Sequence, residues 1–312
     1  MAPEGSKGQR PDQEPHRSRQ GQPVALSVAQ DLEKRRRRAA LRRLIRNQSV
    51  IVGLVITVTL AILSVGAPLF TDVDPTDLNV RKILKPPDAE SLFGTDDYGR
   101  DLFSRVLYGS RVTFAVGLEV AILTTVAGLF LGTLAGFYRQ FDNVIMRFLD
   151  ILMSFPALLM AIGVVAILGP QLFNIVIALV IPLTPRGARV VRASILELRE
   201  TEFVVAARSV GAGDLRIMLR HLLPNCMAPL LVQQTYTLAL AMLSESGLSF
   251  LGVGLPPDVP SLGTTLSVAR TYLRSASWMS FYPGVFISLL VLGFNVLGDG
   301  LRDVLDPRMA GR

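Results

Sequence analysis

The sequence has very few of the residues that build reactive or metal-binding sites. Its 312 residues include one cysteine, Cys226, and two histidines, His16 and His221. A single cysteine excludes an intrachain disulfide and a cysteine-rich metal site, and two distant histidines leave little basis for a histidine metal site or a histidine-based catalytic triad. We therefore expect no metal site, no resident cofactor and no enzyme activity on this chain.

Nucleotide-binding loops are also missing. The sequence contains no Gly-x-x-x-x-Gly-Lys-Ser/Thr phosphate loop. Gly252 and Gly254 resemble part of a dinucleotide fingerprint, but Pro256 and Pro257 follow where a helix would have to begin. If ATP is involved in the function of this protein, it must bind to another chain.

Charge is scarce, and apolar residues are abundant. Charged residues make up 18% of the chain, apolar residues 50%, and the mean hydropathy is +0.43. Several apolar runs reach the roughly 20 residues that cross a bilayer as a helix. The sequence predicts an all-α polytopic membrane protein with six transmembrane helices, at about 49–70, 112–137, 145–168, 171–185, 226–246 and 281–298.

The distribution of lysine and arginine predicts the orientation. Eight basic residues lie at 34–46 and seven at 186–225, whereas 71–111 has six against eight acidic residues, and 247–280 has only Arg270 and Arg274. Basic loops stay in the cytoplasm. We expect a multi-pass protein of the cell membrane with both termini cytoplasmic. The net charge of +7 then reflects contact with membrane lipids, and we expect no nucleic-acid partner.

Composition divides the chain into three parts. Residues 1–30 are rich in Gly, Pro, Gln, Ser and charge, which is typical of a disordered tail. Residues 31–48 are expected to form a basic interfacial helix, with Leu41, Leu44 and Ile45 at helical spacing. The membrane domain occupies 49–312, with an extracytoplasmic loop at about 71–111 and a cytoplasmic loop at about 186–225.

The cytoplasmic loop contains two short amphipathic helices. Apolar residues recur at helical spacing from Phe203 to Val210, Gly211 and Gly213 interrupt the pattern, and a second apolar period from Leu215 is expected to stop at Pro224. This helix–turn–helix resembles the coupling loop of ABC-importer permeases. The residues that match that loop are Val205, Ala206, Ala207, Arg208, Gly211, His221 and Pro224.

Four further segments resemble one branch of that family. They are Arg46–Asn47 with the first span, 92–105 with Gly109 and Arg111, 248–254, and 295–308. In this order they resemble the second (C-type) permease subunit of dipeptide, oligopeptide and nickel ABC importers. Two positions depart from the pattern: Val205 replaces a glutamate common in the wider superfamily, and Leu262 replaces an expected tryptophan in the outer loop.

The resemblance implies a type I ABC importer permease architecture and several partners. These are a homologous permease subunit, two ATPase subunits that bind ATP and Mg, and an extracytoplasmic substrate-binding protein. The implied function is peptide import by alternating access, with ATP hydrolysis on the separate subunits. A nickel or other small-solute importer with the same fold is one alternative, and a stand-alone channel or membrane scaffold is another.

Two residue patterns inside the expected spans indicate helix contacts or a translocation path. Gly128, Gly132 and Gly136 form a small-x-x-x-small series, which predicts close helix contact within the chain or with a partner, and Glu119 faces away from it. Gln234 and Glu245 are eleven residues apart and share one helix face, flanked by Thr237. These three residues are candidates for the translocation path. Interhelical hydrogen bonds, with Glu245 at the outer membrane boundary, are the alternative.

Overall fold

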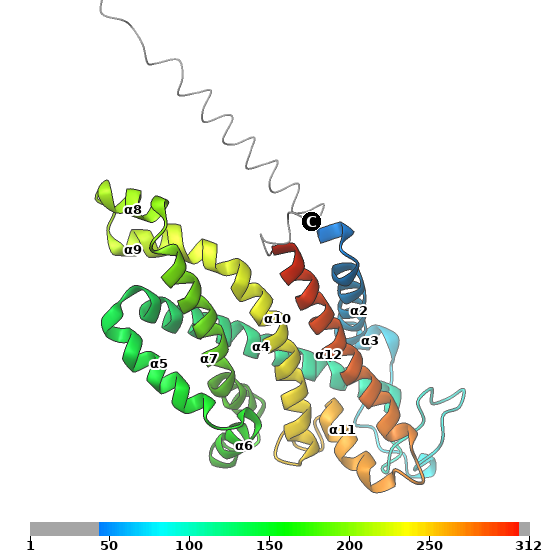
Figure 1. The fold of residues 1–312 in the computed structure, drawn as a ribbon. Helices are drawn as coiled ribbons and strands as arrows, with labels where there is room; N and C mark the ends of the chain where they lie inside the picture. The colour runs from blue at the N-terminus through cyan, green and yellow to red at the C-terminus, as the bar shows by residue number, and fades with distance from the viewer. Residues whose placement is uncertain (1–43, 306–312) are drawn as a thin grey trace, which may run out of the picture. The chain divides into compact units, whose positions relative to one another are not determined.

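The fold is a bundle of helices in the computed structural model, which describes residues 44–305 (Figure 1). The tail predicted at 1–30 and most of the basic helix predicted at 31–48 lie outside these residues. Within them there is no β-strand, only an isolated bridge between Thr95 and Asp101. The all-helical prediction is confirmed.

Five helices are long and apolar enough to cross a membrane. They are α2 (Gln48–Val65), α4 (Leu102–Phe137), α7 (Leu172–Leu198), α10 (Leu223–Phe250) and α12 (Trp278–Leu305). A sixth span is obtained if α5 (Arg139–Met153) and α6 (Ala157–Leu168) are counted together, although they are bent by 89°. The protein is therefore a multi-pass membrane protein, with five or six candidate spans among residues 44–305.

Two predicted spans differ from the observed helices. The span predicted at 145–168 is broken, because α5 ends at Met153 and α6 begins after Pro156, whose ring cannot continue the preceding helix. The span predicted at 171–185 continues to Leu198, with Pro182 and Pro185 buried inside α7. The non-helical part of the cytoplasmic loop therefore begins near Arg199 and not at 186.

Side-chain caps explain where three helices begin. Asn47 accepts a hydrogen bond from the Val50 amide at the start of α2, and Asp101 accepts one from the Ser104 amide at the start of α4. Ser261 and Thr264 form a capping box at the start of α11 (Leu262–Ala269). Each cap satisfies amide groups that have no partner within the helix.

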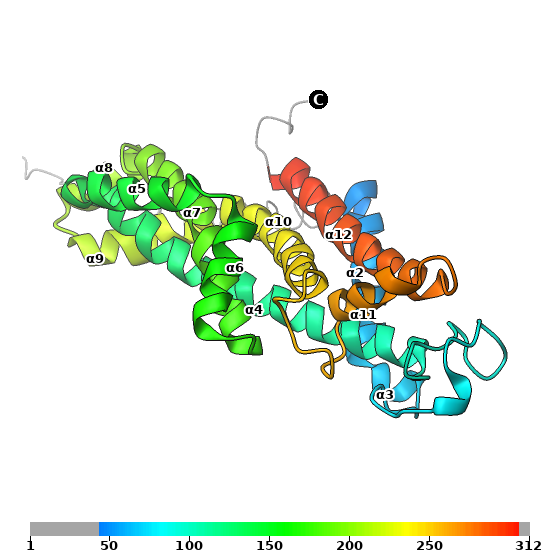
Figure 2. The same ribbon diagram turned by 90° about the horizontal axis from the view of Figure 1, so that it is seen from below.

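The ends of the bundle are distinct. The start of α2, the end of α12 and the helices α8 (Glu202–Ser209) and α9 (Asp214–Ile217) lie at one end, while α11 and residues 71–101 lie at the other (Figure 1). Between these ends α4 runs from beside the 71–101 segment toward α8 and α9, as Figure 2 shows from below.

Glycines allow α4 and α7 to pack closely. A Cβ added to Gly132 would lie 2.5 Å from the Ala188 carbonyl oxygen, and one added to Gly136 would lie 2.9 Å from the Ile195 side chain. The glycine series therefore makes a contact within this chain, as the first alternative predicted. Glu119 lies on the opposite, exposed side of α4, also as expected.

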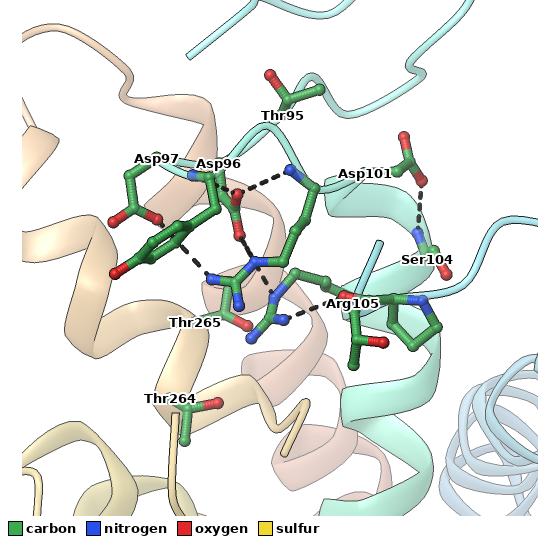
Figure 3. Close-up of polar contacts among 12 residues, drawn as sticks. Thr95, Asp96, Asp97, Asp101, Ser104, Arg105, Thr264 and Thr265 are labelled. Atoms are coloured by element: carbon green, nitrogen blue, oxygen red, sulfur yellow. Dashed lines mark hydrogen bonds and ion pairs between the residues drawn. The ribbon is translucent and has the colours of Figure 1, made fainter. Parts of the chain in front are cut away.

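A buried ion cluster anchors the 71–101 segment to α4 (Figure 3). Asp96 accepts hydrogen bonds from the amides of Tyr98 and Arg100 and from the Arg100 Nε at 2.6 Å, and the Arg105 Nε lies 3.6 Å from its carboxylate. Arg105 also donates to the Pro75 carbonyl. The outer segment, which has little regular structure, is thus held by charge-assisted hydrogen bonds.

Three short helical elements complete the outer end. The helix α3 (Ala67–Phe70) and the 3-10 turn η1 (Val80–Lys82) precede the ion cluster, and the 3-10 turn η3 (Arg270–Tyr272) follows α11. Phe93 stacks on Tyr282 of α12 with ring centroids 3.9 Å apart. This stacking fixes the outer segment to a second helix of the bundle.

Candidate functional site

The helix pair α8–α9 is joined by a tight turn built around Gly211. The Gly211 amide donates to the Arg208 carbonyl, and the Ala212 amide donates to the Ala207 carbonyl, which together form a Schellman motif. Gly211 has φ +83°, a conformation that residues with a Cβ rarely adopt. The sequence thus places its glycine at the position where the turn requires one.

The inner face of the helix pair is anchored to the membrane helices. Val204 of α8 and Ile217 of α9 are fully buried, as is Leu222 in the π-helical turn η2 (Met218–Leu222). They pack in one apolar cluster with residues of α7 and α10, including Ile195 and Leu230. A force on the α8–α9 pair would therefore pass directly to α7 and α10.

The outer face of the pair is apolar and also carries basic side chains. Val205 is 53% exposed and Val210 is 85% exposed. Next to them lies a hollow of about 480 Å³. It is lined by Phe203, Ala206, Ala207, Val210, Ala212, Arg216, Arg220 and His221. An exposed apolar hollow with arginines at its rim has the chemistry of a protein-docking surface.

The other predicted coupling residues lie around this surface. The Arg208 guanidinium lies 5.8 Å from the centre of the Phe137 ring, a cation–π distance, and the His221 ring lies 6.4 Å from that of Phe203. Pro224 is exposed in the first turn of α10. All seven predicted residues are therefore in or beside the α8–α9 pair.

Pro224 does not end the second helix, contrary to expectation. The Leu223 amide bonds the Met218 carbonyl five residues back, so the turn before the proline is widened to a π-helix. The wider turn makes room for the proline ring next to the carbonyl four residues back. The chain passes from α9 through η2 into α10, which makes the loop and the span mechanically continuous.

The three path candidates lie inside the bundle. Gln234, Thr237 and Glu245 are 8%, 3% and 0% exposed. Glu245 accepts hydrogen bonds from Thr113 of α4 at 2.7 Å and from Ser249 at 2.9 Å, and Gln234 accepts one from Thr124 of α4 at 3.1 Å. The interhelical hydrogen bonds of the alternative interpretation are thus present, and a role along the path stays a prediction.

Sequence reasoning missed a group of ion pairs between α5 and α7. Arg192 forms a bidentate pair with Asp142 at 2.5 and 2.6 Å, and Arg189 pairs with Asp150 at 2.5 Å. A partial signal was available, because 139–153 combines polar and apolar residues with helical period and so indicates a polar face that a lipid-embedded span lacks. The pattern does not identify the residues that pair with this face.

Among residues 44–305, no group of three or more His, Cys, Asp or Glu side chains could hold a metal ion.

Two family models match the sequence. Residues 125–311 match the model of the binding-protein-dependent transport system inner membrane component. Residues 36–87 match the N-terminal transmembrane domain of oligopeptide transport permease C. Together these matches include the α8–α9 pair and four of the five long helices in large part.

Similar proteins carry names of the same kind. A Brucella abortus protein named as a peptide transport system permease is 50% identical over 268 residues, covering 86% of this chain and 90% of that protein. The dipeptide transport system permease of Alkalihalophilus pseudofirmus is 43% identical, covering 87% and 90%. The oligopeptide transport system permease of Bacillus subtilis is 38% identical, covering 86% and 89%.

A solved structure has the same fold. A chain of an inward-facing MetNI methionine ABC transporter aligns with a TM-score of 0.54 and 22% identity. The alignment covers 64% of this chain and 96% of that chain. The helical arrangement is therefore shared with a permease of known architecture.

Proposed function

Since this chain belongs to the family of binding-protein-dependent transport system inner membrane components, we propose that it is the C-type permease subunit of an ATP-driven peptide importer. The observation that carries the coupling role is the exposed apolar hollow on α8–α9, whose opposite face is buried against α7 and α10. Support for peptides as substrates comes from the names of the dipeptide and oligopeptide permeases that it resembles over most of its length.

The proposal includes the partners implied by such a system. A homologous permease completes the translocation path, two ATPase subunits bind ATP and Mg, and an extracytoplasmic binding protein delivers the substrate. The termini of the described chain and the α8–α9 pair occupy the same end of the bundle (Figure 1). The basic residues that follow the end of α7 are Arg199, Arg208, Arg216 and Arg220. Together with these residues, the shared end favours an orientation with both termini in the cytoplasm.

Transport then proceeds by alternating access. Closure of the ATPases pushes on Val205, Ala206 and the neighbouring hollow, and the buried faces of α8 and α9 transmit the movement to α7 and α10. Because η2 joins α9 to α10 without a break, little of this displacement is lost in a flexible linker. Hydrolysis takes place on the ATPases.

Gln234, Thr237 and Glu245 have a supporting role in this proposal. Gln234 and Glu245 attach α10 to α4 by hydrogen bonds at two levels, so that the two helices move together. Thr237 lies between them and donates to the backbone carbonyl of Gln233. We therefore propose that these residues act on the translocation path indirectly, by fixing the position of α10 against α4.

Co-purification tests the importer proposal. The full-length chain, tagged and extracted in mild detergent from cells that express the whole system, should retain an ATPase and a second permease. Substituting Ala206→Asp in the lining of the hollow, together with Val205→Asp on the exposed surface of α8, should release the ATPase and keep the second permease. A wild-type chain that purifies alone and conducts solutes without ATP would be a stand-alone channel or membrane scaffold. Uptake of nickel or another small solute instead of peptides would identify a small-solute importer with the same fold.

A further inference from the structure

The coupling mechanism proposed above uses the buried face of α7 and makes no use of the charged surface that α5 and α7 share. On α5, the exposed polar residues recur every three or four positions. They are Gln140, Asn143, Arg147, Asp150 and Ser154. On α7 a matching exposed stripe contains Arg186, Arg189 and Glu197. We call these two stripes together the α5–α7 polar face.

The Asp150–Arg189 ion pair joins the two stripes. It lies at the surface, since the side chains are 61% and 44% exposed, while the neighbouring Asp142–Arg192 pair is 19% and 31% exposed. The inner pair is bidentate and the outer pair makes one contact. The inner pair therefore fixes α5 to α7, and the outer pair can exchange its partners for other charged groups.

Helix length places Arg186, which lies on the α5–α7 polar face, within the membrane. Arg186 is 14 residues from Leu172 and 12 from Leu198, or about 21 and 18 Å along the axis. A hydrocarbon core of about 30 Å that fits within this helix leaves Arg186 at least roughly 9 Å from either boundary. No carboxylate lies within 4 Å of Arg186 among residues 44–305. A charged group at this depth requires water or a polar partner.

A different side of α5 has the chemistry of a lipid-facing surface. A second exposed stripe is entirely apolar. It consists of Phe141, Val144, Phe148 and Ile151, continued by Phe155 after the helix. The residue pattern of α5 makes one side apolar and the adjacent side polar, and the bend of 89° gives this helix a direction different from that of α6. Two surfaces of such different chemistry require different surroundings.

We propose that the α5–α7 polar face lines the hydrated inner part of the translocation path, and that Asp150 and Arg189 contact the charged ends of the transported peptide. This inference rests on the proposed function. A peptide carries an ammonium group at one end and a carboxylate at the other. Asp150 offers an acceptor to the first and Arg189 a bidentate donor to the second, while the two residues pair with each other when no peptide is present.

Cysteine accessibility tests whether the face is hydrated. In a Cys226→Ser background, Arg186→Cys and Asp150→Cys should react with a charged, membrane-impermeant thiol reagent in inside-out vesicles. Phe148→Cys, from the apolar stripe of the same helix, is the matched control and should react at least about tenfold more slowly. Equal rates at positions 148, 150 and 186 would overturn the hydrated face.

Uptake tests the contact with peptide. In proteoliposomes with the binding protein at saturation, Arg189→Gln should lower the maximal uptake of a free dipeptide by about tenfold and change that of its C-terminal amide by less than about twofold. Asp150→Asn should discriminate in the same way between the free and the N-acetylated dipeptide. Arg192→Gln is the control, since loss of a structural pair should affect all peptides equally.

The outcomes separate this inference from the proposed function. Wild-type uptake of both peptides, with an equal loss for both in Arg189→Gln, would refute the peptide contact and leave the importer intact. If the wild-type complex takes up no peptide, the proposed substrate class fails, and with it the contact made by Asp150 and Arg189. The thiol reaction rates would still decide whether the face is hydrated.

Discussion

Gly132 of α4 lies directly against Ala188 of α7, with only 2.5 Å between a Cβ added to the glycine and the alanine carbonyl oxygen. This contact holds together two helices that run in the same direction through the bundle. Gly132→Ala should destabilise the protein by about 1–3 kcal/mol, because the backbones would have to separate. Thermal unfolding in detergent measures this effect. Gly163→Ala is the control, since a Cβ there meets nothing within 4 Å; an equal effect at both positions would show that α4 and α7 are not tightly packed.

The Glu245 hydrogen bonds should stabilise the attachment of α10 to α4. Glu245→Ala leaves the hydroxyls of Thr113 and Ser249 without their acceptor, at about 1–3 kcal/mol for each buried group that stays unpaired. We expect a lower melting temperature and less assembled complex. Glu245→Gln, which retains an acceptor oxygen, should assemble better. If Glu245→Ala assembles normally and changes only the transport rate or the substrate preference, the residue belongs to the path itself.

The outer ion cluster provides a pair of carboxylates with opposite effects on stability. Asp96→Asn should destabilise the protein by about 3–5 kcal/mol, because the buried Arg100 loses its anionic partner. Burial, and next the charge of Asp96, raise the pKa of Asp97 above its ordinary value of 3.8, and its Oδ1 has no hydrogen-bond donor.

The pH dependence of the Asp97 effect follows from that direction. A raised carboxyl pKa in the folded state means that the ionised form costs stability above the folded pKa. This cost disappears as the pH falls through the folded pKa toward 3.8. Asp97→Asn should therefore raise the melting temperature at neutral pH and have no effect once the pH has fallen to about 3.8. A stabilisation that grows as the pH falls would contradict the assignment.

The orientation can be tested with exposed positions at both ends of the bundle. In the Cys226→Ser background, Ala89→Cys and Asp258→Cys lie in the outer loops and should react with an impermeant thiol reagent on intact cells. Ser209→Cys, at the end of α8, should react only after permeabilisation. The reverse pattern would invert the topology. Ser261 is unsuitable for this test, because it is fully buried as the cap of α11.

Local chemistry made several features predictable from the sequence. The positive φ at Gly211 follows from a glycine between two amphipathic periods, and a close helix contact along one side of α4 follows from glycines at every fourth position. That α7 makes this contact did not follow from the sequence. The start of α2 one residue from the expected position reflects the Asn47 cap. These features are determined by residues close together in the sequence, so the residue types alone indicate them.

Features that depend on tertiary packing were not predictable in this way. Hydropathy cannot distinguish a straight span from the bent α5–α6 pair, because the bend changes direction and not composition. Nor does it show that α7 continues through Pro182 and Pro185, whose side chains are buried against neighbouring helices. The pairing of Asp150 with Arg189 joins residues 39 positions apart and required the structure.

In the proposed mechanism, ATP hydrolysis on partner subunits drives peptide import through the turn at Gly211. The most direct measurement is ATP-dependent accumulation of a labelled dipeptide in proteoliposomes that contain the complete complex and its binding protein. Wild type should accumulate the dipeptide only with ATP. Gly211→Glu should insert into the membrane but fail to transport, because a side chain strains a residue at φ +83° by roughly 1 kcal/mol or more and projects into the docking surface. Gly213→Ala, at φ −69° in the same turn, should transport normally. Accumulation without ATP, or normal uptake by well-inserted Gly211→Glu, would contradict the account.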